Sequence, residues 1–283
     1  MKGVMLVCLI LALLVSSPAQ SQTLYDDFTG PLLDSSKWYG NYLWGTNISN
    51  HLEIGQVITK GKLDMFNHCL GSTSDDNSGT TTCSARLIMQ DGSGVTAMEA
   101  LVQPTALAQG RCSGNDVGTN WIRLGGAFFN GSTGAPSDQT NDVQAHISLR
   151  RDANSADPEG ILTIEGVVFR CTAADCGSYV FVTTTGADNP LVLGTIAVKK
   201  KVQLRIAHDP ANNRFIFTQG KGKKAVQQEI VYIDTLQENF PPYSANGGSK
   251  RLEVRHSLAN CSPVPASGWA RAYFDNFYIT RGP

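Results

Sequence analysis

The feature that most constrains this chain is the alternation of apolar and polar residues with a period of two. From Val143 to Arg150 every second residue is apolar, and the same pattern runs from Val202 to Ile206. Successive side chains of a strand point to opposite faces, so this alternation predicts strands with one buried face. Residues 234–239 are predicted to form one helical turn at most. The predicted strands are 84–90, 96–102, 121–129, 143–150, 160–170, 179–185, 202–206, 214–218, 226–233, 251–257 and 270–280.

Turn residues separate these strands at short intervals. Asp209-Pro210 and the pair Asn212-Asn213 lie between two of them, and the chain contains 28 glycines. Such residues tolerate the dihedral angles of tight reversals. Many short strands joined by turns predict an all-β fold, a jelly-roll β-sandwich of two antiparallel sheets.

The N-terminus has the pattern of an export signal. Lys2 precedes an apolar run over residues 4–15, and the small residues Ser17, Ala19 and Ser21 follow it. The run is too short to span a bilayer, so we predict a signal peptide over 1–22 with cleavage near 19–22. A buried N-terminal helix is the alternative interpretation. Residues 23–283 are predicted to form a single domain that is secreted or periplasmic.

The charge of this mature chain is nearly balanced. Lys2 is the one charged residue in 1–22, so the 23 basic residues of the whole chain become 22, against 24 acidic ones. Such a chain has no strong field to attract nucleic acid or an anionic membrane. We therefore expect neither partner, and no membrane span.

An even number of cysteines remains after the signal peptide. An exported chain with six cysteines is expected to form three disulfides, although 15 pairings are possible. A zinc site is the alternative, but it would need a second closely spaced Cys or His pair, so disulfides are favoured. We predict two local pairs and one long-range pair. The predicted disulfides are Cys69–Cys83, Cys171–Cys176 and Cys112–Cys261.

Both ends of the mature chain resemble the concanavalin A-like lectin/glucanase superfamily. Residues 25–28 (Tyr-Asp-Asp-Phe) and 33–38 (Leu-Asp-Ser-Ser-Lys-Trp) are similar to its opening, and 272–279 to its closing strand. Residues 82–87 and 121–125 resemble the family sixteen, laminarinase-like glycoside hydrolases. The resemblance implies a concanavalin A-like jelly roll in which the first and last strands are neighbours.

The strand that carries the catalytic acids in those hydrolases differs here. The resemblance places Asp142, Gln144 and His146 where the family has a nucleophile, a middle acid and an acid/base, all on one face. Gln144 cannot ionise and His146 changes the available protons, so hydrolysis is not expected. A β-elimination lyase could use Gln144 and His146 with Arg86. The alternative is that Gln144 and His146 are polar residues of a solvated sheet face.

Sugar-binding sites combine aromatic rings with polar groups. The candidate ligand-binding residues are therefore Trp44, Arg86, Trp121, Arg123, Gln144 and His146, with packing as the alternative role for both tryptophans. The resemblance also implies a structural Ca²⁺ ion, held by Asp275 with Asp26 or Asp27. The alternative is that Asp275 ties the terminal strands together by hydrogen bonds.

Three functions are compatible with these observations. The first is a secreted, lectin-like protein that binds an extracellular glycan without hydrolysing it. The second is a polysaccharide hydrolase or lyase with an unusual site on the same face. The third is a structural or adhesive protein without a sugar site, which the flat charge profile would suit.

Overall fold

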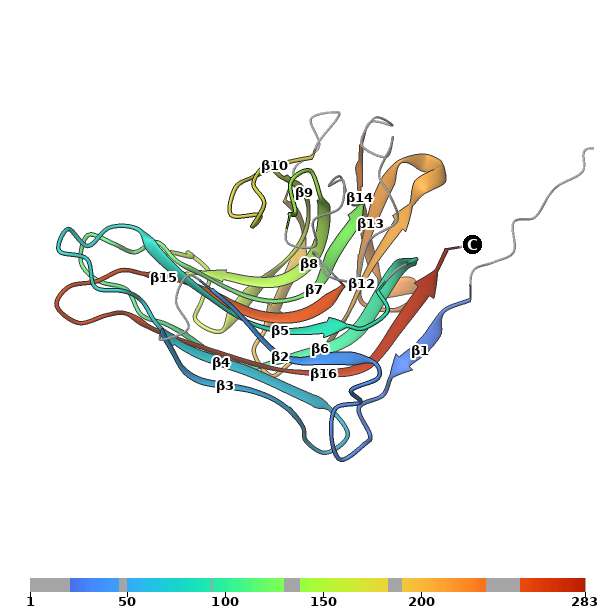
Figure 1. The fold of residues 1–283 in the computed structure, drawn as a ribbon, viewed down its shortest axis with the longest axis horizontal. Helices are drawn as coiled ribbons and strands as arrows, with labels where there is room; N and C mark the ends of the chain where they lie inside the picture. The colour runs from blue at the N-terminus through green and yellow to red at the C-terminus, as the bar shows by residue number, and fades with distance from the viewer. Residues whose placement is uncertain are drawn as a thin grey trace, which may run out of the picture.

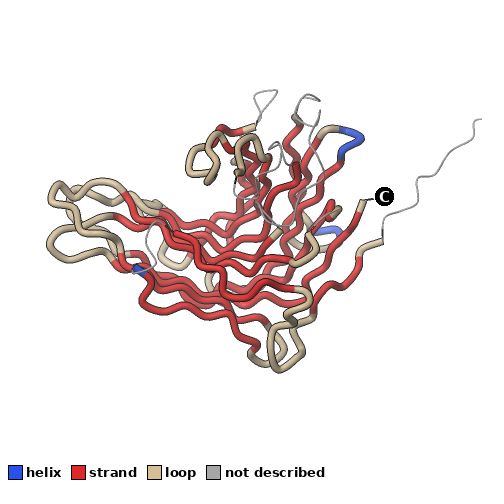
Figure 2. Tube along the Cα trace, in the orientation of Figure 1, coloured by secondary structure: helices blue, strands red, loops and turns tan. Residues whose placement is uncertain are grey.

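The computed structural model describes residues 21–45, 50–92, 94–129, 138–182, 190–232 and 250–282 (Figure 1). These residues form two curved antiparallel sheets stacked on one another, with short 3-10 turns as the helical segments described (Figure 2). The all-β sandwich predicted from the alternation is thereby confirmed. Most of the predicted signal peptide and the turn at 234–239 lie outside the described residues.

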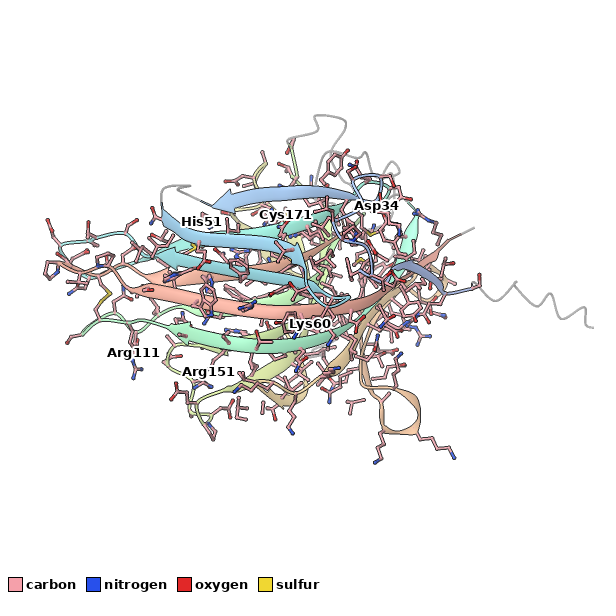
Figure 3. The ribbon with its side chains drawn as sticks, turned by 90° about the horizontal axis from the view of Figure 1, so that it is seen from below. Asp34, His51, Lys60, Arg111, Arg151 and Cys171 are labelled. Carbon is pink, nitrogen blue, oxygen red and sulfur yellow. A yellow bond between two sulfur atoms is a disulfide. The ribbon has the colours of Figure 1, made fainter. Side chains whose placement is uncertain are left out.

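The first sheet has the strand order β14-β13-β12-β6-β16-β4-β3, with β1 paired to β16. Figure 3 shows this sheet from below, with Lys60 at the tip of the β3–β4 hairpin. The pairing of β1 with β16 confirms that the first and last strands are neighbours, as predicted. Its strands are β1 (Thr23–Asp26), β3 (His51–Ile58), β4 (Leu63–Leu70), β6 (Val95–Gln109), β12 (Val202–Asp209), β13 (Arg214–Gln219), β14 (Val226–Val231) and β16 (Ser267–Arg281).

The second sheet has the order β10-β9-β8-β7-β15-β5-β2, with β11 also paired to β9. In Figure 1 its outer face lies on the concave side of the molecule, near β9 and β10. Its strands are β2 (Trp38–Gly45), β5 (Thr80–Met89), β7 (Thr119–Phe129), β8 (Val143–Asp152), β9 (Ile161–Cys171), β10 (Tyr179–Phe181), β11 (Leu191–Ala197) and β15 (Arg251–Ala259).

The inner faces of the two sheets share one hydrophobic core. Leu124 and Val254 of the second sheet and Phe217 and Phe274 of the first are fully buried in it. Trp38 is also buried, and its indole Nε1–H donates to the Asp26 carboxylate at 2.7 Å. Because apolar side chains alternate along each strand, the polar ones are left to the outer faces.

The disulfides are those predicted, Cys69–Cys83, Cys112–Cys261 and Cys171–Cys176. The first lies across β4 and β5, and so joins the two sheets. The second joins the segment after β6 to the segment after β15. The third closes a short loop between β9 and β10. None of the helical segments among the described residues has the length and apolar character of a membrane span.

His146 and His256 are buried in the sandwich and His208 is partly buried, and removal from water disfavours their charged forms. Burial, with a contribution from Lys250, lowers the pKa of His208 from 6.5 to about 4. Burial lowers the pKa of His256 to about 4 as well, and that of His146 well below 6.5. The unfolded chain therefore binds more protons between about pH 6.5 and 4. Stability present above this window is lost as the pH falls through it, by about 3 kcal/mol for each of His208 and His256.

His208 offers a direct test of this pH dependence. Its imidazole stacks on Phe215 and its Nε2 lies 2.7 Å from the Tyr232 hydroxyl. We expect His208→Phe to reduce the slope of the unfolding free energy against pH by about 1 kcal/mol per pH unit below pH 6. Urea unfolding at a series of pH values measures that slope. The control Tyr232→Phe removes the hydrogen bond but keeps the imidazole, and should keep the slope. An unchanged slope in His208→Phe would contradict the assignment.

Candidate functional site

Four arginines gather on the outer face of the second sheet, and we call this site the arginine pocket. Arg251 and Arg255 lie on β15, where they alternate with the core residues Leu252 and Val254. Neighbouring strands supply the other two arginines by the same alternation. These are Arg86 of β5 and Arg123 of β7.

Glu253 lies at the centre of this group. The sheet register places it directly opposite Arg86 on one side and Arg123 on the other. The Nε atoms of Arg86, Arg123 and Arg251 lie 2.9, 2.8 and 3.1 Å from its carboxylate oxygens. The Ser84 hydroxyl also donates to it. One fully buried carboxylate thus holds three guanidinium groups together.

The arginines keep Glu253 ionised. Burial alone would raise its pKa, but Arg123, Arg86 and Arg251 together hold the pKa well below 4.5. A carboxylic acid that donates a proton near neutral pH needs the opposite shift. Glu253 is therefore suited to organising the arginines rather than to acid catalysis.

The pocket is a small cavity of ≈ 70 Å³ beside this cluster. Gln144 lines this cavity, and its amide Nε2 donates to Gln139 at 3.0 Å. The Cys171–Cys176 disulfide holds the wall contributed by the β9–β10 loop, and its sulfur atoms lie 3.5 and 3.7 Å from the same Nε2. The residues that line the cavity are Arg86, Arg123, Gln139, Gln144, Phe169, Asp175, Cys176, Gly177, Tyr179, Arg251 and Arg255.

Aromatic rings lead from the interior of this face to solvent. Phe169 stacks on His146 with ring centroids 5.5 Å apart, and Tyr179 lies 4.9 Å from Phe169. Tyr179 is 51% exposed, and Phe181, 5.6 Å from it on the same edge strand, is 47% exposed. An exposed ring pair thus borders the arginine pocket.

His146 lies behind the pocket rather than in its wall. It is fully buried, and its Nε2 lies 3.2 Å from Gln144 Oε1, which also accepts a bond from Arg251 at 3.2 Å. Its Nδ1 lies against Gly125, where a Cβ atom would come within 2.3 Å of it. Only glycine leaves room for the ring here. His146 therefore orients Gln144, which lines the cavity, and is not itself among the lining residues.

The structure brings together several residues predicted from the sequence. Arg86, Arg123 and Gln144 line the pocket. Trp121 lies beside it, with the Arg255 and Arg123 guanidiniums 5.2 and 6.0 Å from its ring.

Two other predicted residues are not part of this arrangement. Asp142 is buried and is not among the lining residues, and its backbone pairs with Gln139 and Cys171. The side chain of Trp44 lies outside the described residues, although its backbone pairs with Ser84.

Sequence analysis missed Arg251, Glu253, Arg255, Phe169 and Tyr179. The signal for three of them was present, because the run Arg-Leu-Glu-Val-Arg at 251–255 alternates charged with apolar residues on a predicted strand. An alternating set of charges on one strand face indicates a built polar site when the facing strands carry charges too.

The carboxylates proposed for calcium have other partners in the structure. Asp26 accepts hydrogen bonds from the Phe28 amide at 2.9 Å and the Trp38 indole at 2.7 Å. Asp27 accepts from Thr29, and Asp275 from Asn276 at 2.8 Å. The three do not form a converging group of His, Cys, Asp or Glu side chains among the described residues.

Within the described part of the chain, one group of three ligating side chains does converge, His51 with Cys69 and Cys83. Its two cysteines form a disulfide, so they offer no thiolates to a metal. The calcium site gains no support from this geometry and stays a prediction.

No family model matches the sequence, and no curated protein matches it significantly. Among solved structures, the chain is similar to a protein from Mycobacterium abscessus described as a β-glucanase (12% identity, 90% of this chain and 97% of that one, TM-score 0.44). It is also similar to a family 7 alginate lyase (10%, 90% and 98%, 0.42) and to lectin I-B4 from Griffonia simplicifolia (12%, 90% and 98%, 0.31). These similarities concern the β-sandwich fold and carry no activity to this chain.

Proposed function

We propose that this protein binds carbohydrate on the outer face of its second sheet. The observation that supports this most directly is the exposed ring of Tyr179 at the edge of the arginine pocket. Sugars stack on aromatic faces while polar side chains bond their hydroxyl and charged groups. Tyr179 and Phe181 would supply the stacking surface, and Gln144 and the arginines the polar groups.

Binding without hydrolysis follows from the chemistry of the carboxylates. A glycosidase needs two carboxyl groups about 5–9.5 Å apart, one of which carries a proton. Glu253 is buried among arginines that keep it ionised, and Asp142 is not part of the lining. Among the described residues, Asp175 is the one carboxylate of the lining, whereas a glycosidase needs two, so the pocket is suited to holding a glycan rather than cleaving it.

The predicted export is consistent with this role. Three disulfides favour an oxidising compartment such as the periplasm or the extracellular medium, where polysaccharides are found. The signal peptide over 1–22 and the single domain over 23–283 complete the proposal, and the calcium ion predicted from the resemblance remains part of it.

Tyr179→Ala tests the binding surface. We expect it to raise Kd for a bound polysaccharide about tenfold, because a stacked aromatic ring contributes about 1–1.5 kcal/mol. Native electrophoresis through gels that contain one polysaccharide each measures the retardation. Tyr273→Ala is the matched control, since Tyr273 lies on β16 of the other sheet, and should bind normally. Equal retardation of the parent and Tyr179→Ala would place the binding elsewhere.

The same gels separate the alternative functions. Loss of polymer that is abolished by His146→Ala in a folded protein would establish a hydrolase or lyase, and would overturn binding without cleavage. No retardation and no degradation in any gel would favour a structural or adhesive protein. Stable retardation without loss of polymer is the outcome that the geometry supports.

A further inference from the structure

The arginine pocket contains more positive than negative charge. Among the described residues, Arg86, Arg123, Arg251 and Arg255 line the pocket with one carboxylate, Asp175, and Glu253 lies at their centre. Asp175 already accepts a hydrogen bond from the Gly177 amide at 2.9 Å. In this described group four guanidinium groups accompany two carboxylates, and Arg123, Arg251 and Glu253 are almost completely buried.

The hydrogen-bonding capacity of the cluster points the same way. Each guanidinium carries five N–H donors in a planar fork, whereas a carboxylate accepts about four hydrogen bonds. Glu253 contacts Arg86, Arg123 and Arg251 through their Nε atoms. A terminal amino group of Arg251 also donates to Gln144 Oε1 at 3.2 Å. Guanidinium groups bind carboxylates and other oxyanions with paired N–H donors, so a cluster of four suits an oxyanion.

The arginines also experience one another's charge. Burial, followed by repulsion from Arg86, lowers the pKa of Arg251 to about 9. Burial and repulsion from Arg123 lower the pKa of Arg255 to about 10. Both remain charged at neutral pH, and an anion bound among them would offset this repulsion.

We propose that the arginine pocket binds an acidic substituent of the glycan, a carboxylate or a sulfate ester, so that the ligand is an anionic polysaccharide. This inference rests on the proposed carbohydrate binding. The cavity of ≈ 70 Å³ is far smaller than the roughly 300–1,000 Å³ of sites that enclose a whole ligand. It therefore suits one charged substituent, while the sugar ring lies outside against Tyr179.

Matched polymers test this inference with the mature, disulfide-bonded protein. Polygalacturonate is compared with its methyl-esterified form, and dextran sulfate with dextran, by affinity electrophoresis at about 0.15 M salt, where long-range attraction is screened. The variant is Arg255→Gln, because Arg255 lies over Trp121 and its replacement leaves the three ion pairs of Glu253 in place. Arg214→Gln, which replaces a partly exposed arginine of β13 in the other sheet, is the control for loss of one charge.

We expect at least one charged polymer to retard the protein at least tenfold more strongly than its neutral partner does. Arg255→Gln should lose most of this retardation, and Arg214→Gln none. Retardation by polygalacturonate alone assigns the pocket to carboxylates, and retardation by dextran sulfate alone assigns it to sulfate esters. Equal loss in both variants would reveal nonspecific attraction and overturn the inference.

Failure of the inference can be told from failure of the proposed function. Equal retardation by the charged and neutral polymers, sensitive to Tyr179→Ala, would overturn the anionic ligand and keep carbohydrate binding. No retardation by any polymer, neutral β-glucans included, would overturn both.

Discussion

Replacing Glu253 by glutamine is expected to lower the free energy of unfolding by about 3–5 kcal/mol. The substitution keeps the shape of the side chain and removes its charge. Arg86, Arg123 and Arg251 would then remain buried around a neutral amide. The glutamine would also direct an N–H₂ group toward an arginine N–H, so that two donors face each other. Urea unfolding followed by tryptophan fluorescence measures the loss.

Glu229→Gln is the matched control for this prediction. Glu229 is an exposed strand residue whose Oε2 lies 2.8 Å from Arg214, so we expect a change of at most about 1 kcal/mol. The double variant Glu253→Gln/Arg123→Gln should recover part of the loss, because it removes one uncompensated charge. A loss below about 1 kcal/mol in Glu253→Gln would show that other groups compensate the arginines.

The same cluster shows how far sequence patterns reach. The alternation at 251–257 correctly predicted a strand with one buried face, and β15 extends it to Ala259. The partners of Glu253 lie 167 and 130 residues away, at Arg86 and Arg123. Their contact depends on which strands are neighbours and in which register, and no local pattern contains that information.

Strand ends and some whole strands were missed for identifiable reasons. The predicted strand 96–102 stops before Pro104, but β6 continues to Gln109. Proline is tolerated there because its carbonyl accepts a hydrogen bond from the Lys199 amide, so that its nitrogen faces away from the paired strand β16, on the side where the pairing with β12 covers residues 97–102. In β11, Gly194 lies at a register shift that breaks the alternation. β1 to β4 were not predicted from periodicity; of these, β1 and β2 overlap the segments at 25–28 and 33–38 quoted for the family resemblance.

The site was predicted only in part, because alternation along one strand is visible in the sequence and the pairing of strands is not. Arg123 and Gln144 follow from alternation, since each shares a strand with core residues. Tyr179 could not be chosen from the sequence, because its place beside Gln144 depends on the pairing of β8 with β9 and of β9 with β10.

The last prediction concerns the long-range disulfide. Replacing both Cys112 and Cys261 by alanine is expected to lower the free energy of unfolding by about 5 kcal/mol. The two residues are 149 positions apart, and in the chain-entropy account the stabilisation grows with the length of the closed loop. Cys171 and Cys176 are only 5 positions apart, so the same replacement there should cost about 2 kcal/mol.

The two double variants thus control for each other. Each removes two sulfur atoms and one covalent bond, and they differ in the length of chain that is released on unfolding. Cys112→Ala/Cys261→Ala should unfold at a much lower urea concentration but bind its polysaccharide normally when folded. Cys171→Ala/Cys176→Ala should keep most of its stability and lose binding, because that disulfide forms the wall of the arginine pocket beside Gln144. Equal losses of stability in the two variants would mean that native packing around the sulfurs, rather than loop closure, sets the contribution of these bonds.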